Sequence, residues 1–439
     1  MATTYVSARL KLQNAASEIQ KTKDVTENHQ SVTLAEAIGR VAARDYFSPI
    51  STPEFDTSAM DGYAICSERT RLASPETPIF FTVRGTIAAG DKCPSIPPQN
   101  GIDNPQPCLE IMTGGRFPEG NMLDACVKVE DTVRIAASVP CIAVSKPIPR
   151  YANRRFAGED IQKGDIVLRK GNLIRSSHIM PLASVGINTI DVCRMPRVCV
   201  WSTGNELTSH MSYIRDVNGV YLTAASKETG AEVEFMGSIR DEVDAVASAI
   251  RKRLEASPTD IMLTSGGVSV GKFDHIRQAL EVLGAKVVFH GVAVRPGHPV
   301  LFALLPSISG EVAFFGLPGN PGAAAACFKF LTLPYINFLL GRESEKPIPA
   351  RLEDLNLGSS SRKSIMDAPN RGLNTDRFMP GVMDMTGDAP TVREASEVLG
   401  PAKMRPFVQA NCWIHIRANE KVEAGQMVSC YPMNDSSIS

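Results

Sequence analysis

The sequence lacks an excess of charge of either sign. Its 439 residues carry 46 Lys and Arg against 47 Asp and Glu, which gives a formal net charge of -1 at pH 7. This balance argues against a general nucleic-acid binder and against a protein that adheres to membrane surfaces. It leaves room for local basic pockets.

Long hydrophobic runs and paired cysteines are also missing. No apolar stretch reaches the roughly 18 residues of a membrane-spanning helix, and Lys329 and Pro334 interrupt the longest candidate, residues 323–340. Residues 1–12 lack the apolar block of a secretion signal. The 10 cysteines form no Cys-x-x-Cys pair, which favours reduced, buried thiols over a disulfide framework or a zinc site. We therefore expect a cytoplasmic protein without a membrane or nucleic-acid partner.

The chain is about three times as long as a typical domain, which predicts two to four domains. Apolar spacing predicts a helix near the start of the chain and a second helical segment over residues 32–41. Short β-rich runs between Pro and Gly clusters predict an inserted β-domain over residues 49–149. Residues 343–349 are interpreted as a linker to a small β-rich C-terminal domain.

Residues 196–341 alternate strand-like and helix-like segments, which predicts a mostly parallel sheet covered on both faces. The expected strands are 197–202, 233–238, 261–264, 287–290, 300–304 and 312–316, and the expected helices are 241–255, 273–283 and 322–340.

Two glycine-rich loops follow strands of this sheet: Thr-Ser-Gly-Gly-Val-Ser-Val-Gly at 264–271 and Gly-Leu-Pro-Gly-Asn-Pro at 316–321. In a parallel sheet, ligands bind beyond the carboxyl ends of the strands. Glycine lets backbone N–H groups approach an anion, and a helix N-terminus adds partial positive charge. The two loops together favour a phosphate or another polyanion, although each loop alone also fits an ordinary turn.

Charged residues follow other strands of the same sheet. Glu206, Asp241 and Asp274 would repel a polyanion unless a hard divalent cation lay between them, so Mg²⁺ is the economical inference. The alternative is that Asp241 and Asp274 stabilise helix N-termini. Arg295 and His298 are suited to hold an oxyanion, although either residue alone is more often a solvated surface group.

Two further segments combine acids with small residues or with arginines: Asp-Thr-Ser-Ala-Met-Asp-Gly-Tyr-Ala at 56–64 and Asn-Arg-Arg-Phe-Ala-Gly-Glu-Asp at 153–160. Their residues alone fit catalysis and interdomain ion pairing equally well. Together with Ile-Met-Thr-Gly at 111–114, Ser-Thr-Gly-Asn-Glu-Leu at 202–207 and the two glycine loops, the first segment resembles the MoeA/gephyrin E-domain family of molybdopterin molybdenumtransferases. The order and spacing fit from about residue 5 to residue 432.

The resemblance implies an elongated, multi-domain homodimer of α/β plus β class. It would contain a doubly wound, mostly parallel α/β domain, an inserted β-domain, a small linking domain and a C-terminal β-barrel. The implied boundaries are 1–30 and 193–345 for the α/β domain III, 31–49 and 150–192 for the linking domain I, 50–149 for the inserted domain II, and 346–439 for the barrel domain IV.

The resemblance also implies a transferase of molybdenum cofactor biosynthesis. Molybdate would be a substrate, adenylated molybdopterin would come from a separate adenylyltransferase, and the adenylate would be hydrolysed with Mg²⁺ to release AMP and molybdenum cofactor. The implied catalytic residues are Asp61, Thr113, Arg155, Asp160, Glu206, Asp241 and Asp274, of which the last three would hold Mg²⁺. The implied substrate contacts are Ser265, Gly266, Gly267, Ser269, Gly271, Arg295, His298, Pro318, Gly319 and Asn320.

The chain departs from the family pattern near the expected anion site. The family usually has Lys-Pro-Gly-Lys-Pro where this chain places Arg295 and His298. The loop at 401–406 has lost hydroxyls and gained Lys403 and Arg405, which we expect to compensate for the two lysines across the dimer. Two alternatives stay open at this point: a paralogue acting on a different anionic substrate, and a non-enzymatic scaffold.

Overall fold

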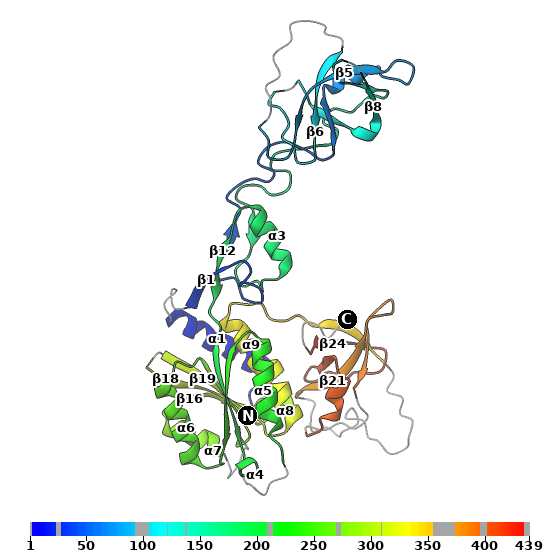
Figure 1. The fold of residues 1–439 in the computed structure, drawn as a ribbon. Helices are drawn as coiled ribbons and strands as arrows, with labels where there is room; N and C mark the ends of the chain where they lie inside the picture. Colours follow the sequence, from blue (N-terminus) through cyan, green and yellow to red (C-terminus); the bar gives the residue numbers. More distant parts are fainter. Residues whose placement is uncertain are drawn as a thin grey trace. The chain divides into compact units, whose positions relative to one another are not determined.

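The computed structural model describes residues 2–22, 28–92, 105–120, 122–136, 138–208, 214–268, 274–308, 310–353, 374–395 and 402–433. The chain divides into two compact units. The first comprises residues 1–43, 171–174 and 191–439, and the second comprises residues 44–170 and 175–190. Figure 1 traces the chain by colour, and each unit is described by itself below.

The first unit contains a six-stranded sheet with the order β14–β13–β15–β19–β18–β16. Strands β14, β13, β15 and β19 pair in parallel, whereas β18 is antiparallel to both of its neighbours. The short connection from β18 to β19 explains this exception, because a tight hairpin joins only antiparallel strands. All six expected strands are present, as β13 (Arg197–Thr203), β14 (Glu232–Ile239), β15 (Ile261–Ser265), β16 (Lys286–His290), β18 (Leu301–Ser307) and β19 (Gly310–Leu317).

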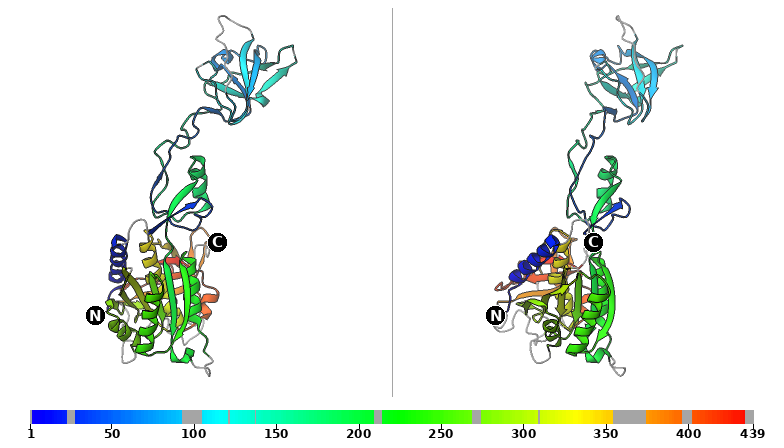
Figure 2. Two further views of the ribbon diagram at one scale, coloured as in Figure 1. Left: turned by 60° about the vertical axis from the view of Figure 1, so that its left-hand side comes forward. Right: turned by 90° about the vertical axis from the view of Figure 1, so that its left-hand side faces the viewer.

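Helices cover both faces of this sheet, which confirms the doubly wound arrangement. On one face, Val198 and Val200 of β13 share a core with α1, α5, α8 and α9. On the other face, Cys199 and Trp201 pack with α6 and α7. Figure 2 shows α1, in blue, beside the yellow helix α9, which it contacts. The bounds are α1 (Tyr5–Thr22), α4 (Asn205–Thr208), α5 (Val217–Glu228), α6 (Val243–Ala256), α7 (His275–Val282), α8 (Pro321–Cys327), the π-helix η3 (Phe328–Thr332) and α9 (Leu333–Leu339).

Among the described residues, one continuous helical stretch, Pro321–Leu339, is long and apolar enough to cross a membrane by length and composition. Of its most apolar window, 83% is buried inside the fold, so the stretch serves as the core helix of this unit. Lys329 within it is buried and places its Nζ 2.9 Å from Glu345 Oε2.

The helix expected over residues 32–41 is wrong. Strand β1 (His29–Thr33) pairs there with β12 (Thr189–Cys193), and turns follow it. The Ala37 N–H donates to the Thr33 carbonyl, and Gly39, with φ +78°, donates its N–H to the Ile174 carbonyl. The bond to Thr33 closes a single helical turn, after which the N–H groups of Gly39 and Ala42 bond to Ile174 and Asn172 instead, so no helix continues.

The first unit ends in a closed five-stranded barrel, as expected for the C-terminal region. Strands β21, β22, β20, β24 and β23 pair in that order, and β23 pairs back to β21. Their bounds are β20 (Ile348–Leu352), β21 (Asp376–Asp384), β22 (Thr391–Glu394), β23 (Cys412–Ile416) and β24 (Met427–Pro432). Because β20 begins at Ile348, the expected linker over 343–349 is too long by two residues. A short strand from the α/β region, β17 (Val294–Arg295), pairs in parallel with β21.

The second unit contains a six-stranded sheet with the order β7–β4–β6–β5–β9–β8, in which only β5 and β6 are parallel. This sheet confirms the predicted inserted β-structure. Its strands are β4 (Gly62–Ile65), β5 (Ile79–Ile87), β6 (Gln106–Ile111), β7 (Ala125–Lys128), β8 (Thr132–Ile135) and β9 (Cys141–Val144). The rest of the unit holds α3 (Ser176–Ser184) and two short strand pairs: β2 (Tyr46–Phe47) with β11 (Ile166–Leu168), and β3 (Thr57–Ser58) with β10 (Arg154–Arg155).

Candidate functional site

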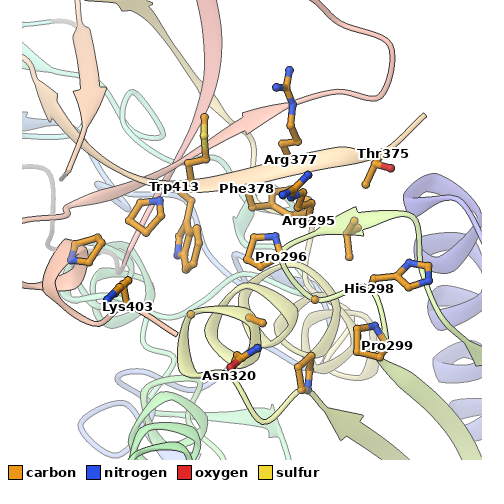
Figure 3. A pocket seen from close by; sticks show the side chains of 18 of the residues that line it. Arg295, Pro296, His298, Pro299, Asn320, Thr375, Arg377, Phe378, Lys403 and Trp413 are labelled. Atoms are coloured by element: carbon orange, nitrogen blue, oxygen red, sulfur yellow. The ribbon is translucent and has the colours of Figure 1, made fainter. Parts of the chain in front are cut away.

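A pocket of about 730 Å³ lies in the first unit, between the loops around β17 and α8 and the barrel (Figure 3). Three cationic side chains line it: Arg295, Arg377 and Lys403. No Asp or Glu is among the described residues that line it. A concave site with a net positive lining is suited to an anion of small size.

Strand pairing positions two of these cations. Arg295 of β17 stands directly opposite Arg377 of β21, and the Asp376 N–H fixes the register by donating to the Ala293 carbonyl at 3.0 Å. Burial lowers the pKa of Arg377, and the positive charge of Arg295 lowers it further, while Glu420 opposes the change. Two neighbouring guanidiniums on paired strands repel each other, and an oxyanion between them would remove that repulsion.

His298 lines the pocket but directs its ring elsewhere. Its Nδ1 lies 2.8 Å from the Val292 carbonyl oxygen, and because a carbonyl only accepts, Nδ1 carries the proton. Figure 3 shows the ring turned away from Arg295. Lys403 supplies the further cation from the barrel of the same chain, whereas the expectation placed this compensation across the dimer. Arg405, which was expected to assist, is not among the lining residues.

Aromatic side chains form an apolar floor under the cations. Trp413 of β23 is buried, with 2% of its surface exposed, and its ring meets that of Phe407 edge-on at 5.5 Å. Phe378 of β21 stacks on Phe330 of η3 with ring centroids 3.8 Å apart. The floor is therefore packed into the core, which fixes the positions of the backbone segments that carry the cations.

The two glycine loops meet at the carboxyl ends of β15 and β19. Gly266 has φ +100°, and a Cβ there would lie 2.4 Å from the Thr203 carbonyl oxygen, so only glycine fits. Its N–H donates to the Leu317 carbonyl at 3.0 Å, and Ser265 Oγ donates to the Pro318 carbonyl at 3.1 Å. The loop after β19 also contributes Pro318 and Asn320 to the pocket wall. The predicted contacts Ser269 and Gly271 lie outside the described residues.

Asp241 lies close to the first of these loops, and Glu206 lies near enough to Asp241 for their charges to interact. A Cβ at Gly267 would be 3.4 Å from Asp241 Oδ1, and one at Gly204 would be 2.6 Å from Glu206 Oε1. Burial raises the pKa of Asp241, Thr203 lowers it, and the negative charge of Glu206 raises it again. Asp241 Oδ1 is buried and has no hydrogen-bond partner among the residues that the structure describes. An unpartnered buried carboxylate oxygen beside a second acid is suited to a cation.

Asp274 is engaged differently. It caps α7 by accepting the Arg277 N–H at 3.2 Å, and its Oδ2 lies 3.4 Å from His290 Nδ1. Burial raises its pKa, while these contacts lower it. The helix-capping interpretation therefore describes Asp274, although Asp241 does not cap α6. Within the part of the chain that the structure describes, no three His, Cys, Asp or Glu side chains are grouped to hold a metal.

The other predicted site residues belong to the second unit. Asp61 accepts hydrogen bonds from the Thr113 N–H at 2.7 Å and from its hydroxyl at 2.9 Å, and both lower the pKa of Asp61. Arg155 and Asp160 are exposed. The neighbouring Arg154 is the residue of its segment that forms an ion pair, with Nε 2.8 Å from Asp56 Oδ2.

Sequence reasoning missed two residues of the first unit. Arg377 belongs to no recognisable motif, and only the β17–β21 register reveals its position. Asn218 follows Asp216, which caps α5 by accepting the Gly219 N–H at 2.8 Å. That pattern signals a helix start in the sequence, but not the contacts that Asn218 makes with both glycine loops.

Comparisons with known proteins agree with this geometry. A model described as MoeA N-terminal region (domain I and II) matches residues 8–186, and one described as probable molybdopterin binding domain matches residues 199–337. The molybdopterin molybdenumtransferase of Staphylococcus epidermidis is 34% identical over 390 residues, which cover 87% of this chain and 89% of that protein. The Synechococcus elongatus protein of the same name is 34% identical over 70% of this chain and 74% of its own length.

Solved structures show the same fold. Two structures of the molybdopterin biosynthesis MoeA protein from Pyrococcus horikoshii align with TM-scores of 0.71 and 0.75, at 28% and 23% identity. They cover 96% and 98% of this chain and 98% and 100% of their own chains. The expected fold class is therefore confirmed.

Proposed function

The chain belongs to the molybdopterin molybdenumtransferase family and is a transferase, and from this premise we propose that it inserts molybdenum from molybdate into adenylated molybdopterin with release of AMP. The observation that carries the proposal is the pocket lined by Arg295, Arg377 and Lys403, whose described lining includes no carboxylate. Molybdate is a tetrahedral dianion, and guanidinium and ammonium groups recognise such an oxyanion through charge-assisted hydrogen bonds.

The proposed route places the two substrates on neighbouring loops. The loop at 318–320 forms one wall of the oxyanion pocket and contacts the loop at 265–267 through Ser265. The phosphate groups of the adenylated substrate would lie beside Gly266 and Gly267, where the positive φ of both residues shapes the loop after β15. The oxyanion would then be held next to the pterin side of the same substrate, which favours transfer by proximity.

We assign Mg²⁺ to Glu206 and Asp241. Asp241 lies next to Gly267 and interacts with the charge of Glu206, and one oxygen of Asp241 has no hydrogen-bond partner among the described residues. Mg²⁺ commonly takes one or two carboxylates together with substrate phosphates, so the missing third carboxylate does not exclude it. When bound, the ion would neutralise phosphate charge during adenylate hydrolysis. Asp274 would not bind the ion directly; as the N-cap of α7, it would hold the start of that helix in place.

We also propose a homodimer in which the second unit of one subunit completes the cleft of the other, through Asp61, Thr113, Arg155 and Asp160. The two hydrogen bonds from Thr113 keep Asp61 ionised, so it would present a fixed negative charge. Adenylated molybdopterin would be delivered by a separate adenylyltransferase. The domain boundaries given above remain part of this proposal.

The test combines the purified protein with adenylated molybdopterin, Mg²⁺ and molybdate. We expect AMP release together with reconstitution of an apo-molybdoenzyme, and loss of both when Mg²⁺ is chelated. Equal AMP release with sulfate or phosphate in place of molybdate, without reconstitution, would instead support a paralogue that acts on another oxyanion. The cations of Arg377 and Lys403 argue against that alternative, because they retain the charge lost where His298 replaces lysine.

A further inference from the structure

Asn218 bridges the two glycine loops. It lies in the first turn of α5, and its Nδ2 donates to Ser265 Oγ at 2.8 Å and to the Gly319 carbonyl oxygen at 2.7 Å. Ser265 precedes Gly266 at the end of β15, and Gly319 belongs to the loop after β19. One side-chain amide therefore joins three elements that are far apart in sequence.

The chemistry of the partners fixes the orientation of this amide. The Gly319 carbonyl can only accept, so the amide nitrogen must face it. Ser265 Oγ uses its own hydrogen on the Pro318 carbonyl at 3.1 Å, so it accepts from Asn218. Both Nδ2 hydrogens are thus engaged, while Asn218 Oδ1 is buried with no hydrogen-bond partner in the part of the chain that the structure describes.

The loops that Asn218 joins serve different ligands in the proposed function. Ser265 and Gly266 lie at the proposed phosphate side, close to Asp241, whereas Pro318 and Asn320 line the oxyanion pocket. The bond from the Gly266 N–H to the Leu317 carbonyl fixes only the base of the two loops. Asn218 holds the loops together at Gly319, two residues beyond Leu317.

We propose that Asn218 is a positioning residue that keeps the wall of the oxyanion pocket in register with the phosphate-binding loop. This inference rests on the proposed function, because it assigns one ligand to each loop. Asn218 itself acts through Ser265 and Gly319, so its removal would weaken the binding of both ligands. Removal of Arg295 would weaken the binding of the oxyanion alone.

The test is Asn218→Asp in the full chain, which keeps the size of the side chain but removes both donors at neutral pH. Its carboxylate would face the Gly319 carbonyl, so the loop would move away. We expect about a tenfold rise in the Kd for molybdate by calorimetry, and a higher KM for adenylated molybdopterin. The matched control is Val220→Asp, which adds the same charge at an exposed position of α5 and should leave both values unchanged.

A pH series separates positioning from loss of structure. As the pH falls from about 8 to about 5, the half-buried aspartate of the variant, which faces a carbonyl oxygen, gains a proton and can donate one hydrogen bond again. We therefore expect the ratio of variant to parent Kd for molybdate to shrink over this range. A ratio that stays constant, or a variant that binds as tightly as the parent at neutral pH, would overturn the inference. Failure of the parent itself to bind molybdate would instead overturn the proposed function.

An alanine variant gives a second measurement. Asn218→Ala removes both bonds without adding charge, so its Kd for molybdate should rise by a similar factor and show no recovery at low pH. If Asn218→Ala bound molybdate with the same Kd as the parent, the two hydrogen bonds of Asn218 would have no role in the pocket.

Discussion

Arg377 acquires its role from the strand that carries it. No motif surrounds it, and it lines the pocket because β21 pairs with β17 and brings it opposite Arg295. Arg295 itself could be predicted from its Arg-Pro-Gly-His-Pro segment. The contrast is physical: a local motif can be read in the sequence, whereas a cross-strand neighbour depends on tertiary register.

Replacement of this arginine should weaken the anion site. Arg377→Ala removes a charge-assisted donor, so we expect the Kd for molybdate to rise about 10- to 100-fold, as measured by calorimetry at low salt. Arg351→Ala, on the exposed side of β20 and away from the pocket, is the matched control. Equal effects of the two variants would show that the overall electrostatic field of the protein, rather than Arg377 itself, determines the affinity for molybdate.

Asp241 should make stability depend on pH. Because burial raises its pKa, the folded protein holds this proton more tightly than the unfolded chain does, and stability falls as the pH rises from the ordinary carboxyl range through the raised pKa. Asp241→Asn cannot ionise. Without Mg²⁺, its melting temperature should exceed that of the parent by a few degrees at neutral pH, and the difference should vanish near pH 4.

The same variant tests the metal assignment. Mg²⁺ should raise the melting temperature of the parent and leave that of Asp241→Asn unchanged, because the unpartnered oxygen is lost. An equal Mg²⁺ response in both proteins would place the ion elsewhere.

At the scale of elements, the α/β sheet could be predicted because its four central strands, β13, β15, β19 and β18, contain continuous buried runs. The segment at 32–41 misled the prediction because its apolar spacing suits a helix, while pairing of β1 with β12 supplies the backbone partners. Helix α5 was also missed. Its Leu222 is buried but Val220 is exposed, so its apolar residues do not form a single stripe.

Gly266 and Gly284, which follows α7, allow a controlled test of close packing. Both have positive φ, but a Cβ at Gly266 would meet backbone atoms of Thr203, whereas no described residue lies within 4 Å of a Cβ at Gly284. Gly284→Ala should cost about 1–2 kcal/mol of stability and keep activity. Gly266→Ala should cost clearly more, since it displaces Thr203, and should abolish AMP release.

Urea denaturation and the AMP assay measure both effects. Similar losses in the two alanine variants would mean that conformational strain, rather than contact with Thr203, explains the glycine at 266.

At the scale of the whole molecule, the division into two units predicts two unfolding events. The oxyanion pocket belongs entirely to the first unit. Molybdate at about 100 times its Kd should therefore stabilise that unit by about 2.7 kcal/mol and leave the other transition in place. Scanning calorimetry with and without molybdate checks this, and a joint shift of all transitions would argue against separate units.

At this scale, the family resemblance predicted more of the architecture than composition and periodicity did. Composition and periodicity indicated several domains, but they gave neither the closure of the barrel nor the chain's repeated passage between the two units. Closure depends on β21 pairing with β23 as well as with β22. Such long-range pairings leave no mark on the local pattern of either strand.

Helix α1 is synthesised long before α9, the helix that it contacts in the folded protein. It ends at Thr22 and contacts α9, which begins at Leu333, so 310 residues lie between them. At about 5–20 residues per second, a ribosome needs roughly 15 to 60 s to make that stretch. Throughout this interval the apolar face of α1, including Leu12 and Ile19, has no α9 to cover it. The nascent chain is thus a natural client for chaperones that shield hydrophobic segments.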